Sequence, residues 1–281
     1  MTCSEHPGYA ASMHHESEQP STCAIAVMAK ASIAGRAKTR LMPTLTPEQA
    51  ADLNTSFLRD VADNLIAASA LANITAHMAY APAGSAPFFK GILPESIGLI
   101  ETVAPTFGEC LLHAARTLLE AGSTSVCLLN SDSPTLPVGY LVAAATALAV
   151  PGDRVVLGPS TDGGYYLIGI KQAHAGLFEG IDWSTERVFR QTVARAGELG
   201  LAVHELPTWY DVDDAASLGT LIGELFGGRP FRSCGSRPTP AVWTRRQLAG
   251  SDLEQRFAPA ARSVASRDPP KHRHTAAGDA P

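Results

Sequence analysis

Hydrophobic residues fall into two repeating patterns along the middle of the chain. Short apolar runs of five to eight residues are bounded by polar or turn-forming residues, which is typical of buried β-strands. Between them lie longer segments in which apolar residues recur every three or four positions, as on one face of an α-helix. The predicted strands are Ala24–Ala29, Ile74–Ala81, Ser125–Leu129, Arg154–Gly158, Tyr165–Ile170 and Ala202–Leu206.

Two of the predicted helices begin at a capping box, in which a Thr side chain and a Gln or Glu three residues later satisfy free backbone N–H groups. The boxes are Thr46–Gln49, with Pro47 at the first helical position, and Thr106–Glu109. The first helix is expected to run to about residue 70, and the second to stop at Gly122. Further helices are expected over Tyr140–Ala149, over about Ser184–Leu199 and from near Asp213.

Strands that alternate with helices predict βαβ units. The expected fold is therefore a single Rossmann-type α/β domain, with a mostly parallel sheet flanked by helices, over residues 22–227. Residues 1–21 are polar and lack periodicity, so they are predicted to be a disordered N-terminal segment. Residues 228–281 are rich in Arg, Pro and Ala and are predicted to be a mostly disordered tail, with one weakly helical piece at Ala241–Arg256.

Composition excludes several classes of protein. The chain has 281 residues, 45% of them hydrophobic, which is enough to bury a sizeable core. The longest uncharged run, Asn64–Phe89, is interrupted by polar residues and prolines, so no membrane span is expected. The N-terminus lacks the features of a signal peptide, and the five cysteines are widely spaced. A cytoplasmic protein with reduced thiols is expected.

The net charge of −5 is unevenly distributed. Residues 229–281 hold ten Lys and Arg against four Asp and Glu, a net charge of +6, whereas the rest of the chain holds 12 cations against 23 carboxylates, a net charge of −11. Because nucleic-acid binding needs a basic surface, nucleic acid is not expected as the partner of the domain.

The loop after the first strand carries four cations and a glycine. Backbone amides around Gly35, together with Lys38 and Arg40, could neutralise a di- or triphosphate. Lys30 and Arg36 are the other two cations. The spacing matches neither a Walker A loop nor the Rossmann glycine motif, and a solvated basic loop is the alternative.

Three further motifs place aspartates near the ends of strands, where ligands bind in parallel α/β sheets. Asp132 follows the strand at 125–129 and could ligate Mg²⁺ or close a local turn. Asp162-Gly163-Gly164 fits either a tight hairpin or a backbone that approaches a ligand closely. Asp211, Asp213 and Asp214 would repel one another without a cation, and Asp213 or Asp214 could also cap the last helix.

Taken in order, these motifs resemble a family of bacterial nucleotide-diphospho-sugar transferases, some of which are described as arsenosugar-biosynthesis glycosyltransferases. The resemblance runs from about Cys23 to Leu225. It rests on the blocks Lys30–Leu41, Ser131–Leu136, Leu157–Ile170, Ile181–Thr185 and Asp211–Asp214. Similar loops occur in 2-phospholactate and molybdenum-cofactor guanylyltransferases. The resemblance implies a GT-A-like fold that binds a nucleotide and a divalent metal, Mg²⁺ or Mn²⁺.

Carried over by motif, the resemblance also implies roles for individual residues. Lys30, Gly35, Lys38 and Arg40 would bind the nucleotide phosphates. Asp132 and Asp162 would be the catalytic carboxylates, and Gly163 and Gly164 would line the substrate site beside Asp162. Asp132 would ligate the metal together with Asp213 or, as the alternative, with Asp211. The chain departs from the family pattern at Ser32 and Ala34, where prolines are usual, at Cys110 in place of an Arg and at Asn130 in place of a Gly.

Three functions follow as hypotheses. The first is a metal-dependent glycosyltransferase that uses a nucleotide sugar and a small-molecule acceptor. The second is a nucleotidyltransferase, in which a phosphorylated small molecule attacks a nucleoside triphosphate and releases pyrophosphate. The third is a non-catalytic nucleotide-binding module whose basic tail recruits a partner. The oligomeric state is not predicted.

Overall fold

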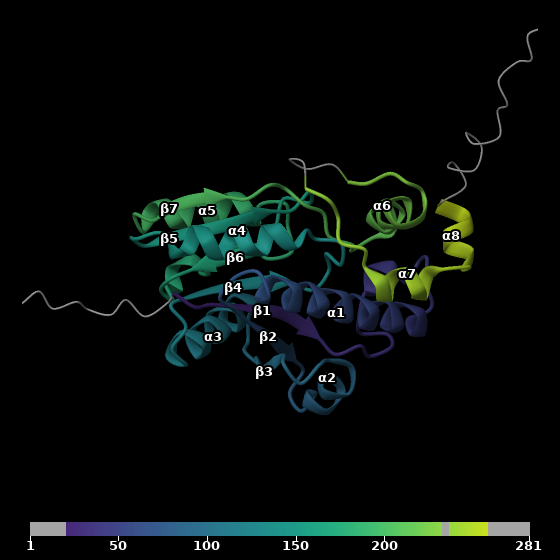
Figure 1. Cartoon of the computed structure of the whole chain (residues 1–281), viewed down its shortest axis with the longest axis horizontal. Coiled ribbons are helices and arrows are strands. Elements are labelled where there is room, and N and C mark those ends of the chain that lie inside the picture. The colour runs from purple at the N-terminus through teal and green to yellow at the C-terminus, as the bar shows by residue number, and fades with distance from the viewer. Residues whose placement is uncertain (1–20, 232–235, 258–281) are drawn as a thin grey trace, which may run out of the picture.

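A seven-stranded sheet lies at the centre of the computed structural model, which describes residues 21–231 and 236–257 (Figure 1). The strand order is β3-β2-β1-β4-β6-β5-β7. Every strand is parallel to the others except β6, which pairs antiparallel with both β4 and β5. The strands are β1 (Cys23–Lys30), β2 (Ile74–Ala81), β3 (Gly98–Glu101), β4 (Ser125–Asn130), β5 (Arg154–Pro159), β6 (Tyr165–Ile170) and β7 (Ala202–Glu205). The predicted α/β fold with a mostly parallel sheet is confirmed.

Helices cover both faces of the sheet because adjacent strand residues point to opposite sides. Ile25 and Val27 of β1 belong to a core shared with α1 (Pro47–Ser69), α4 (Val138–Ala149) and α6 (Ala215–Phe226). Ala24 and Ala26 belong to a second core shared with α3 (Phe107–Glu120) and α5 (Val188–Glu198). No helix among the described residues is both long and apolar enough to cross a bilayer.

Local signals identified the helix starts well. Both predicted capping boxes are formed: Thr46 and Gln49 cap α1, and Thr106 and Glu109 cap α3. The helix expected from about Ser184 begins later, at Val188, because the backbone at Ser184 has a positive φ of 65° and cannot continue a right-handed helix. Two elements were not predicted, the short helix α2 (Ala86–Ile92) and the edge strand β3.

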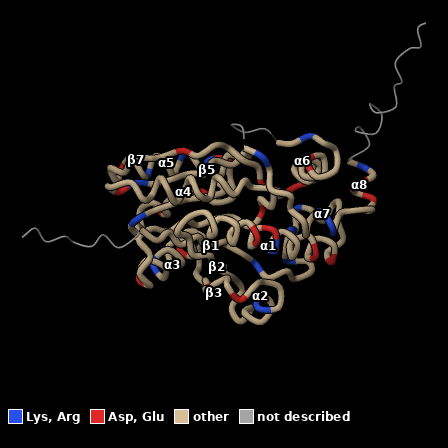
Figure 2. Tube along the Cα trace, in the orientation of Figure 1, with Lys and Arg blue, Asp and Glu red and all other residues tan. Residues whose placement is uncertain are grey.

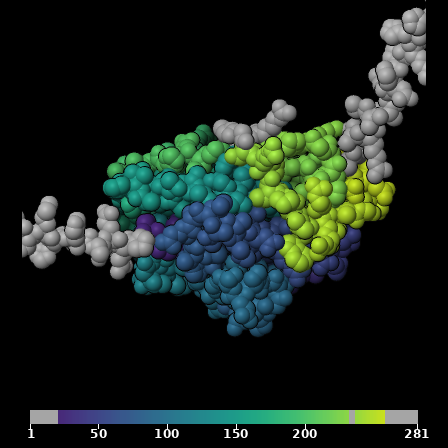
Figure 3. Space-filling model, in the orientation of Figure 1, coloured from purple at the N-terminus to yellow at the C-terminus, as the bar shows by residue number. Residues whose placement is uncertain are grey.

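The C-terminal part of the chain forms two helices over the stretch Ala241–Arg256, where one weakly helical piece was predicted within a mostly disordered tail. Helix α7 (Val242–Leu248) packs on α1, and α8 (Asp252–Phe257) lies beside α6. Figure 3 shows this segment, in yellow, directly against the surface of α1, in blue. Residues 242–257 thus contact the domain predicted over residues 22–227. The predictions for residues 1–20, 232–235 and 258–281 lie outside the described residues.

Charged residues of both signs are interspersed along the trace, as Figure 2 shows. Positive and negative residues are therefore not separated onto different surfaces. The charge of the site depends on which of these residues the fold brings into contact.

Candidate active site

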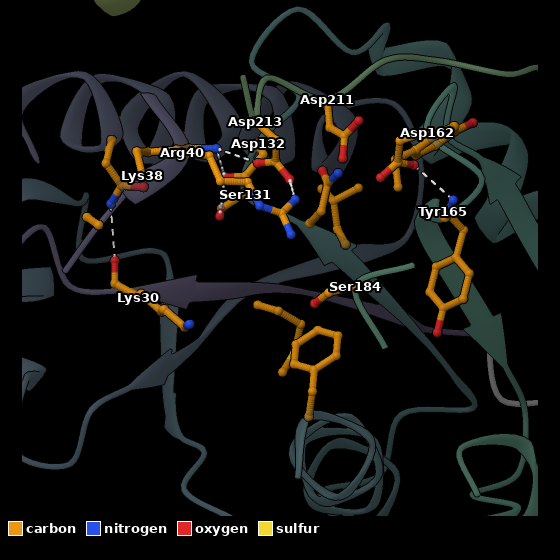
Figure 4. A pocket seen from close by; sticks show the side chains of 18 of the residues that line it. Lys30, Lys38, Arg40, Ser131, Asp132, Asp162, Tyr165, Ser184, Asp211 and Asp213 are labelled. Atoms are coloured by element: carbon orange, nitrogen blue, oxygen red, sulfur yellow. Dashed lines mark hydrogen bonds and ion pairs between the residues drawn. The ribbon is translucent and has the colours of Figure 1, made fainter. Parts of the chain in front are cut away.

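A cleft of about 470 Å³ opens at the carboxyl ends of β1 and β4, which are neighbouring strands at the centre of the sheet. Its size is in the range of small-molecule sites. Basic residues of the loop after β1 line one part of the cleft, and four aspartates from three other loops complete it (Figure 4). The charged lining residues are Lys30, Arg36, Lys38, Arg40, Asp132, Asp162, Asp211 and Asp213.

Lys38 is the residue on which the charged groups converge. Its Nζ lies 2.7 Å from Asp132 Oδ1 and 3.3 Å from Asp213 Oδ1, and it donates a hydrogen bond to the Val212 carbonyl at 2.7 Å. The Lys38 side chain is only 5% exposed, whereas Asp132 and Asp213 keep 27% and 38% of their side-chain surface in solvent. The two carboxylates therefore share one buried ammonium and still face the cleft.

The loop after β1 is shaped to send Lys38 inward. Lys38 has a left-handed backbone conformation, and a single 3₁₀ turn at Thr39–Leu41 follows it, with Leu41 fully buried. Helix α1 supports the start of the loop, because the Asn54 amide donates hydrogen bonds to the Lys30 carbonyl and to Ser32 Oγ. Arg40 reaches the same cluster, with its Nη1 3.7 Å from Asp213 Oδ2.

Asp132 is held by the loop that follows β4. Ser131 Oγ donates a hydrogen bond to Asp132 Oδ1 at 2.9 Å, and the Val212 N–H donates to the Asp132 carbonyl at 2.9 Å. This second bond joins the loop after β4 to the loop before α6, which lies nearly eighty residues later in the sequence. The Asp132 side chain therefore meets the cluster at Lys38 and does not close the local turn that was the alternative.

The three carboxylates at 211–214 separate into different roles. Asp214 caps α6, with its Oδ1 accepting the Ser217 N–H at 2.8 Å, so Asp213 is free to reach Lys38. Asp211 accepts a hydrogen bond from Ser160 Oγ at 2.8 Å. Burial, reinforced by the charge of Asp162, raises the pKa of Asp211 to about 6. Burial also raises the pKa of Asp213, and the charge of Lys38 opposes that shift.

The Asp162-Gly163-Gly164 motif forms the turn between the antiparallel strands β5 and β6, so the hairpin interpretation is correct. Asp162 and Gly164 also line the cleft, and the Gly164 N–H donates to Asp162 Oδ1 at 2.8 Å. Gly163 is not among the lining residues. Its φ is +89°, and a Cβ there would lie 2.4 Å from the Glu186 carbonyl oxygen, so the turn needs glycine for a packing reason.

The structure thus brings most of the predicted site residues together in one cleft, but neither Gly35 nor Gly163 lines it. Sequence reasoning missed several uncharged lining residues, among them Asn54, Phe107, Tyr165 and Ser184. Of these residues, only Phe107 could have been recognised from the sequence, because a large aromatic residue is unusual at the first position of a helix. In the structure its side chain is 48% exposed. It packs edge-on against Trp183, with ring centroids 5.2 Å apart.

The donor set at Lys38 is compatible with a divalent cation. Two oxygens from different carboxylates already converge on one cationic nitrogen, and Mg²⁺ typically takes one or two protein carboxylates. Within residues 21–231 and 236–257, no group of three or more His, Cys, Asp or Glu side chains is arranged to hold a metal ion. Asp132 and Asp213 therefore fit such a cation better than a set of three aspartates that includes Asp211, which bonds to Ser160.

One solved structure resembles the chain over most of its length. A protein of Desulfovibrio desulfuricans G20, described as a candidate nucleotide-diphospho-sugar transferase, is 28% identical to this chain, with a TM-score of 0.70. The match covers 84% of this chain and 98% of that protein. This similarity confirms the resemblance that the sequence motifs indicated.

Two more distant structures share less with the chain. A cytidylyltransferase of Leptospira borgpetersenii serovar Hardjo-bovis is 12% identical with a TM-score of 0.48, and the match covers 85% of this chain and 98% of that one. Rv0371c of Mycobacterium tuberculosis H37Rv, solved as a complex with manganese, is 14% identical with a TM-score of 0.39, covering 69% and 91% of the two chains.

The chain also matches one protein-family model. Residues 64–185 match a family described as an uncharacterized protein conserved in bacteria, DUF2064. No curated protein matches the chain.

Proposed function

We propose that this chain is a metal-dependent transferase with a nucleotide-activated donor, and that the donor is a nucleotide sugar. The observation that carries the proposal is the cluster at the carboxyl ends of β1 and β4, where Asp132 and Asp213 share Lys38 beside three further cations. The 28% identity to a candidate nucleotide-diphospho-sugar transferase, over nearly the whole length of that protein, supports the nucleotide-sugar donor.

The cations of the loop after β1 take the phosphates in this proposal. Lys38 and Arg40 are already paired with carboxylates, whereas none of the ion pairs formed by residues 21–231 and 236–257 uses Lys30 or Arg36. These two side chains are exposed and line the cleft, so they can meet phosphate oxygens without first giving up a carboxylate.

Asp132 and Asp213 are the residues that would hold the metal. A divalent cation there supplies positive charge that stabilises the leaving diphosphate. Asp162 and Gly164 line the cleft beyond Asp211, and this part of the cleft takes the acceptor in the proposal.

Nucleotidyl transfer is the second candidate function, and one feature favours it. The loop places four cations along one part of the cleft, and a triphosphate carries more negative charge than a diphosphate ester. In that reaction a phosphorylated acceptor attacks the α-phosphate, and pyrophosphate leaves against the same cations.

A thermal-unfolding screen tests the proposal. The purified chain is heated with UDP-, GDP-, ADP- and dTDP-sugars and with the four nucleoside triphosphates, each with and without Mg²⁺ or Mn²⁺. A ligand present at about 100 times its Kd stabilises the native state by about 2.7 kcal/mol, which is a measurable shift in Tm. A metal-dependent shift with one nucleotide sugar is the expected result.

The substitution D132N provides the matched test of the site. It is expected to abolish the metal dependence of that shift, because one of the two shared carboxylates becomes an uncharged amide. D52N makes the same chemical change at an exposed position on α1 and is expected to behave like the wild type. A metal-dependent shift with triphosphates alone would favour nucleotidyl transfer, and no shift with any compound would contradict both candidates and favour a partner-binding role.

A further inference from the structure

Tyr210 lies behind the cleft, in the loop that carries Asp213 and against the loop that carries Asp132. Its side chain is buried, and its hydroxyl lies 3.0 Å from both Glu224 Oε1 and Thr135 Oγ1. The Tyr210 hydroxyl donates to Glu224 and shares its second hydrogen bond with the Thr135 hydroxyl. A chain of hydrogen bonds thus runs from the loop after β4, through Tyr210, to helix α6.

The backbone of the same segment ties the two loops together as well. Ser133 Oγ donates to the Tyr210 carbonyl at 2.9 Å, and the Val212 N–H donates to the Asp132 carbonyl at the same distance. The side chains of Asp132 and Asp213, which belong to these two loops, meet at Lys38 (Figure 4). A shift of one loop against the other would therefore change the separation of the two carboxylates.

The aromatic ring of Tyr210 has its own packing, which does not depend on the hydroxyl. It stacks on Trp209 with centroids 5.8 Å apart and contacts Phe231 with centroids 5.0 Å apart. Glu224 is also held in place from another side, since its Oε2 accepts the Phe231 N–H at 2.9 Å. Replacing Tyr210 with Phe would consequently remove the hydrogen-bond chain and keep the packed ring.

We propose that Tyr210 is a positioning residue whose hydroxyl, held between Thr135 and Glu224, sets the spacing of Asp132 and Asp213 and thereby the affinity of the site for a divalent cation. This inference rests on the proposed function, because it assigns these two carboxylates to a cation. None of Tyr210, Thr135 and Glu224 lines the cleft, so the three act through the aspartates and not on a substrate.

The test uses two variants that delete a hydroxyl and two controls. Y210F and T135V each break the chain of hydrogen bonds, whereas T135S keeps the Thr135 hydroxyl. Y80F is the matched control, because the Tyr80 hydroxyl is also paired with a glutamate, Glu101, and these two residues lie on β2 and β3, outside the two loops. Mn²⁺ is the probe, and free Mn²⁺ is measured by electron paramagnetic resonance with no nucleotide present. Amide hydrogen exchange of the segments 129–136 and 207–214 is measured on the same proteins.

Y210F and T135V are expected to weaken Mn²⁺ binding about tenfold, the lower end of the effect of removing a partner that orients a metal ligand. Exchange in both segments is expected to become about tenfold faster, because the bonds joining the loops open more often. T135S and Y80F are expected to match the wild type in both measurements. If the residues served only global stability, folded Y210F and T135V would bind Mn²⁺ as tightly as the wild type.

The two measurements separate the failure of this inference from the failure of the proposed function. Unchanged exchange in both Y210F and T135V would overturn the positioning role, whatever the Mn²⁺ titration shows. Faster exchange with unchanged Mn²⁺ affinity would overturn the link between this network and the cation. If the wild type binds no Mn²⁺, the metal in the proposed function is contradicted, and the exchange measurement still decides whether Tyr210 holds the two loops together.

Discussion

Lys38 shows at the scale of one residue how the site is assembled. An ammonium that is 5% exposed needs partners, because burying an unpaired charge is costly. Lys38 has three oxygen partners, from Asp132, Asp213 and the Val212 carbonyl, and its Nζ also lies 5.3 Å from the centroid of the Phe57 ring. A phosphate or a divalent cation that enters the cleft must therefore compete with contacts that already exist.

The substitution K38M tests that competition. Its uncharged side chain is similar in length, but it leaves Asp132 and Asp213 without the shared positive charge. We expect the metal-free variant to be less stable by about 1–2 kcal/mol, below the cost of breaking a fully buried ion pair because both carboxylates are partly solvated. Added Mg²⁺ should raise the Tm of K38M more than that of the wild type, since it replaces the missing charge.

Thermal unfolding with and without Mg²⁺ measures both effects. K90M, at an exposed position on α2, is the control for the loss of a lysine charge. Equal stability of K38M and wild type without Mg²⁺, together with equal responses to Mg²⁺, would show that Lys38 does not hold the two carboxylates together.

At the scale of the element, the β5–β6 hairpin is the part that inserts Asp162 into the site. The Ser160 N–H donates to the Gly164 carbonyl, and the Thr161 N–H donates to the Trp209 carbonyl. The turn is thus joined both to its own strands and to the segment that leads to Asp211 and Asp213. The Glu186 backbone lies where a Cβ of residue 163 would stand, and the Gly164 N–H holds the Asp162 carboxylate at 2.8 Å.

Two glycine-to-alanine substitutions distinguish two causes of lost stability: a left-handed backbone conformation and a steric contact of the new Cβ. Gly35 and Gly163 both have a positive φ, of 76° and 89°, but open space surrounds Gly35, whereas a Cβ at residue 163 meets the Glu186 backbone. G35A is expected to cost about 1 kcal/mol for the left-handed conformation. G163A is expected to cost at least about 1–3 kcal/mol more, because backbone atoms must move. Chemical denaturation gives both values, and equal costs would contradict the contact with Glu186.

At the scale of the whole molecule, one aspartate of α1 anchors the C-terminal segment. Asp60 Oδ1 and Oδ2 accept the backbone N–H groups of Trp243 and Thr244 at 2.8 Å. These two N–H groups lie in the first turn of α7, whose own N-cap residue, Ala241, supplies no side-chain cap. Asp63 adds a bond from the Trp243 indole N–H at 3.0 Å. A helix that lacks a local cap is thus completed by a distant part of the sequence.

This anchor predicts a dependence of stability on pH. Burial raises the pKa of Asp60 above its ordinary value of 3.8, and the backbone hydrogen bonds only partly oppose that shift. The folded state therefore holds the proton more tightly than the unfolded state. The stability due to this group is complete below about pH 3.8 and declines as the pH rises through the raised pKa. D60N does not titrate, so the wild type should lose stability relative to D60N over this window.

Urea unfolding of both proteins at several pH values from 4 to 7 measures the difference directly. The test is how the difference in unfolding free energy between the wild type and D60N changes with pH. A constant part of that difference is expected at every pH, because the Asn side chain of D60N has one hydrogen-bond acceptor fewer. If the wild type instead gains stability relative to D60N as the pH rises, the two N–H bonds to Asp60 outweigh its burial and the pKa is lowered.

The sequence by itself determined those features that depend on local chemistry. Capping boxes, apolar runs and turn residues predicted most strands, the starts of α1 and α3, and the hairpin at Asp162, because each is stabilised by neighbours a few residues away. The position of acidic and basic residues after strands also predicted which loops form the site, because the carboxyl ends of parallel strands meet at one edge of a sheet.

Only the tertiary structure decided what depends on distant partners. The edge strand β3 forms because it pairs with β2, and α7 forms because Asp60 caps it from α1. Among the aspartates, tertiary contacts assign Asp214 to α6, Asp211 to Ser160, and Asp132 and Asp213 to Lys38. The residue types of these carboxylates are identical, so their different roles arise from which loops the fold places against one another.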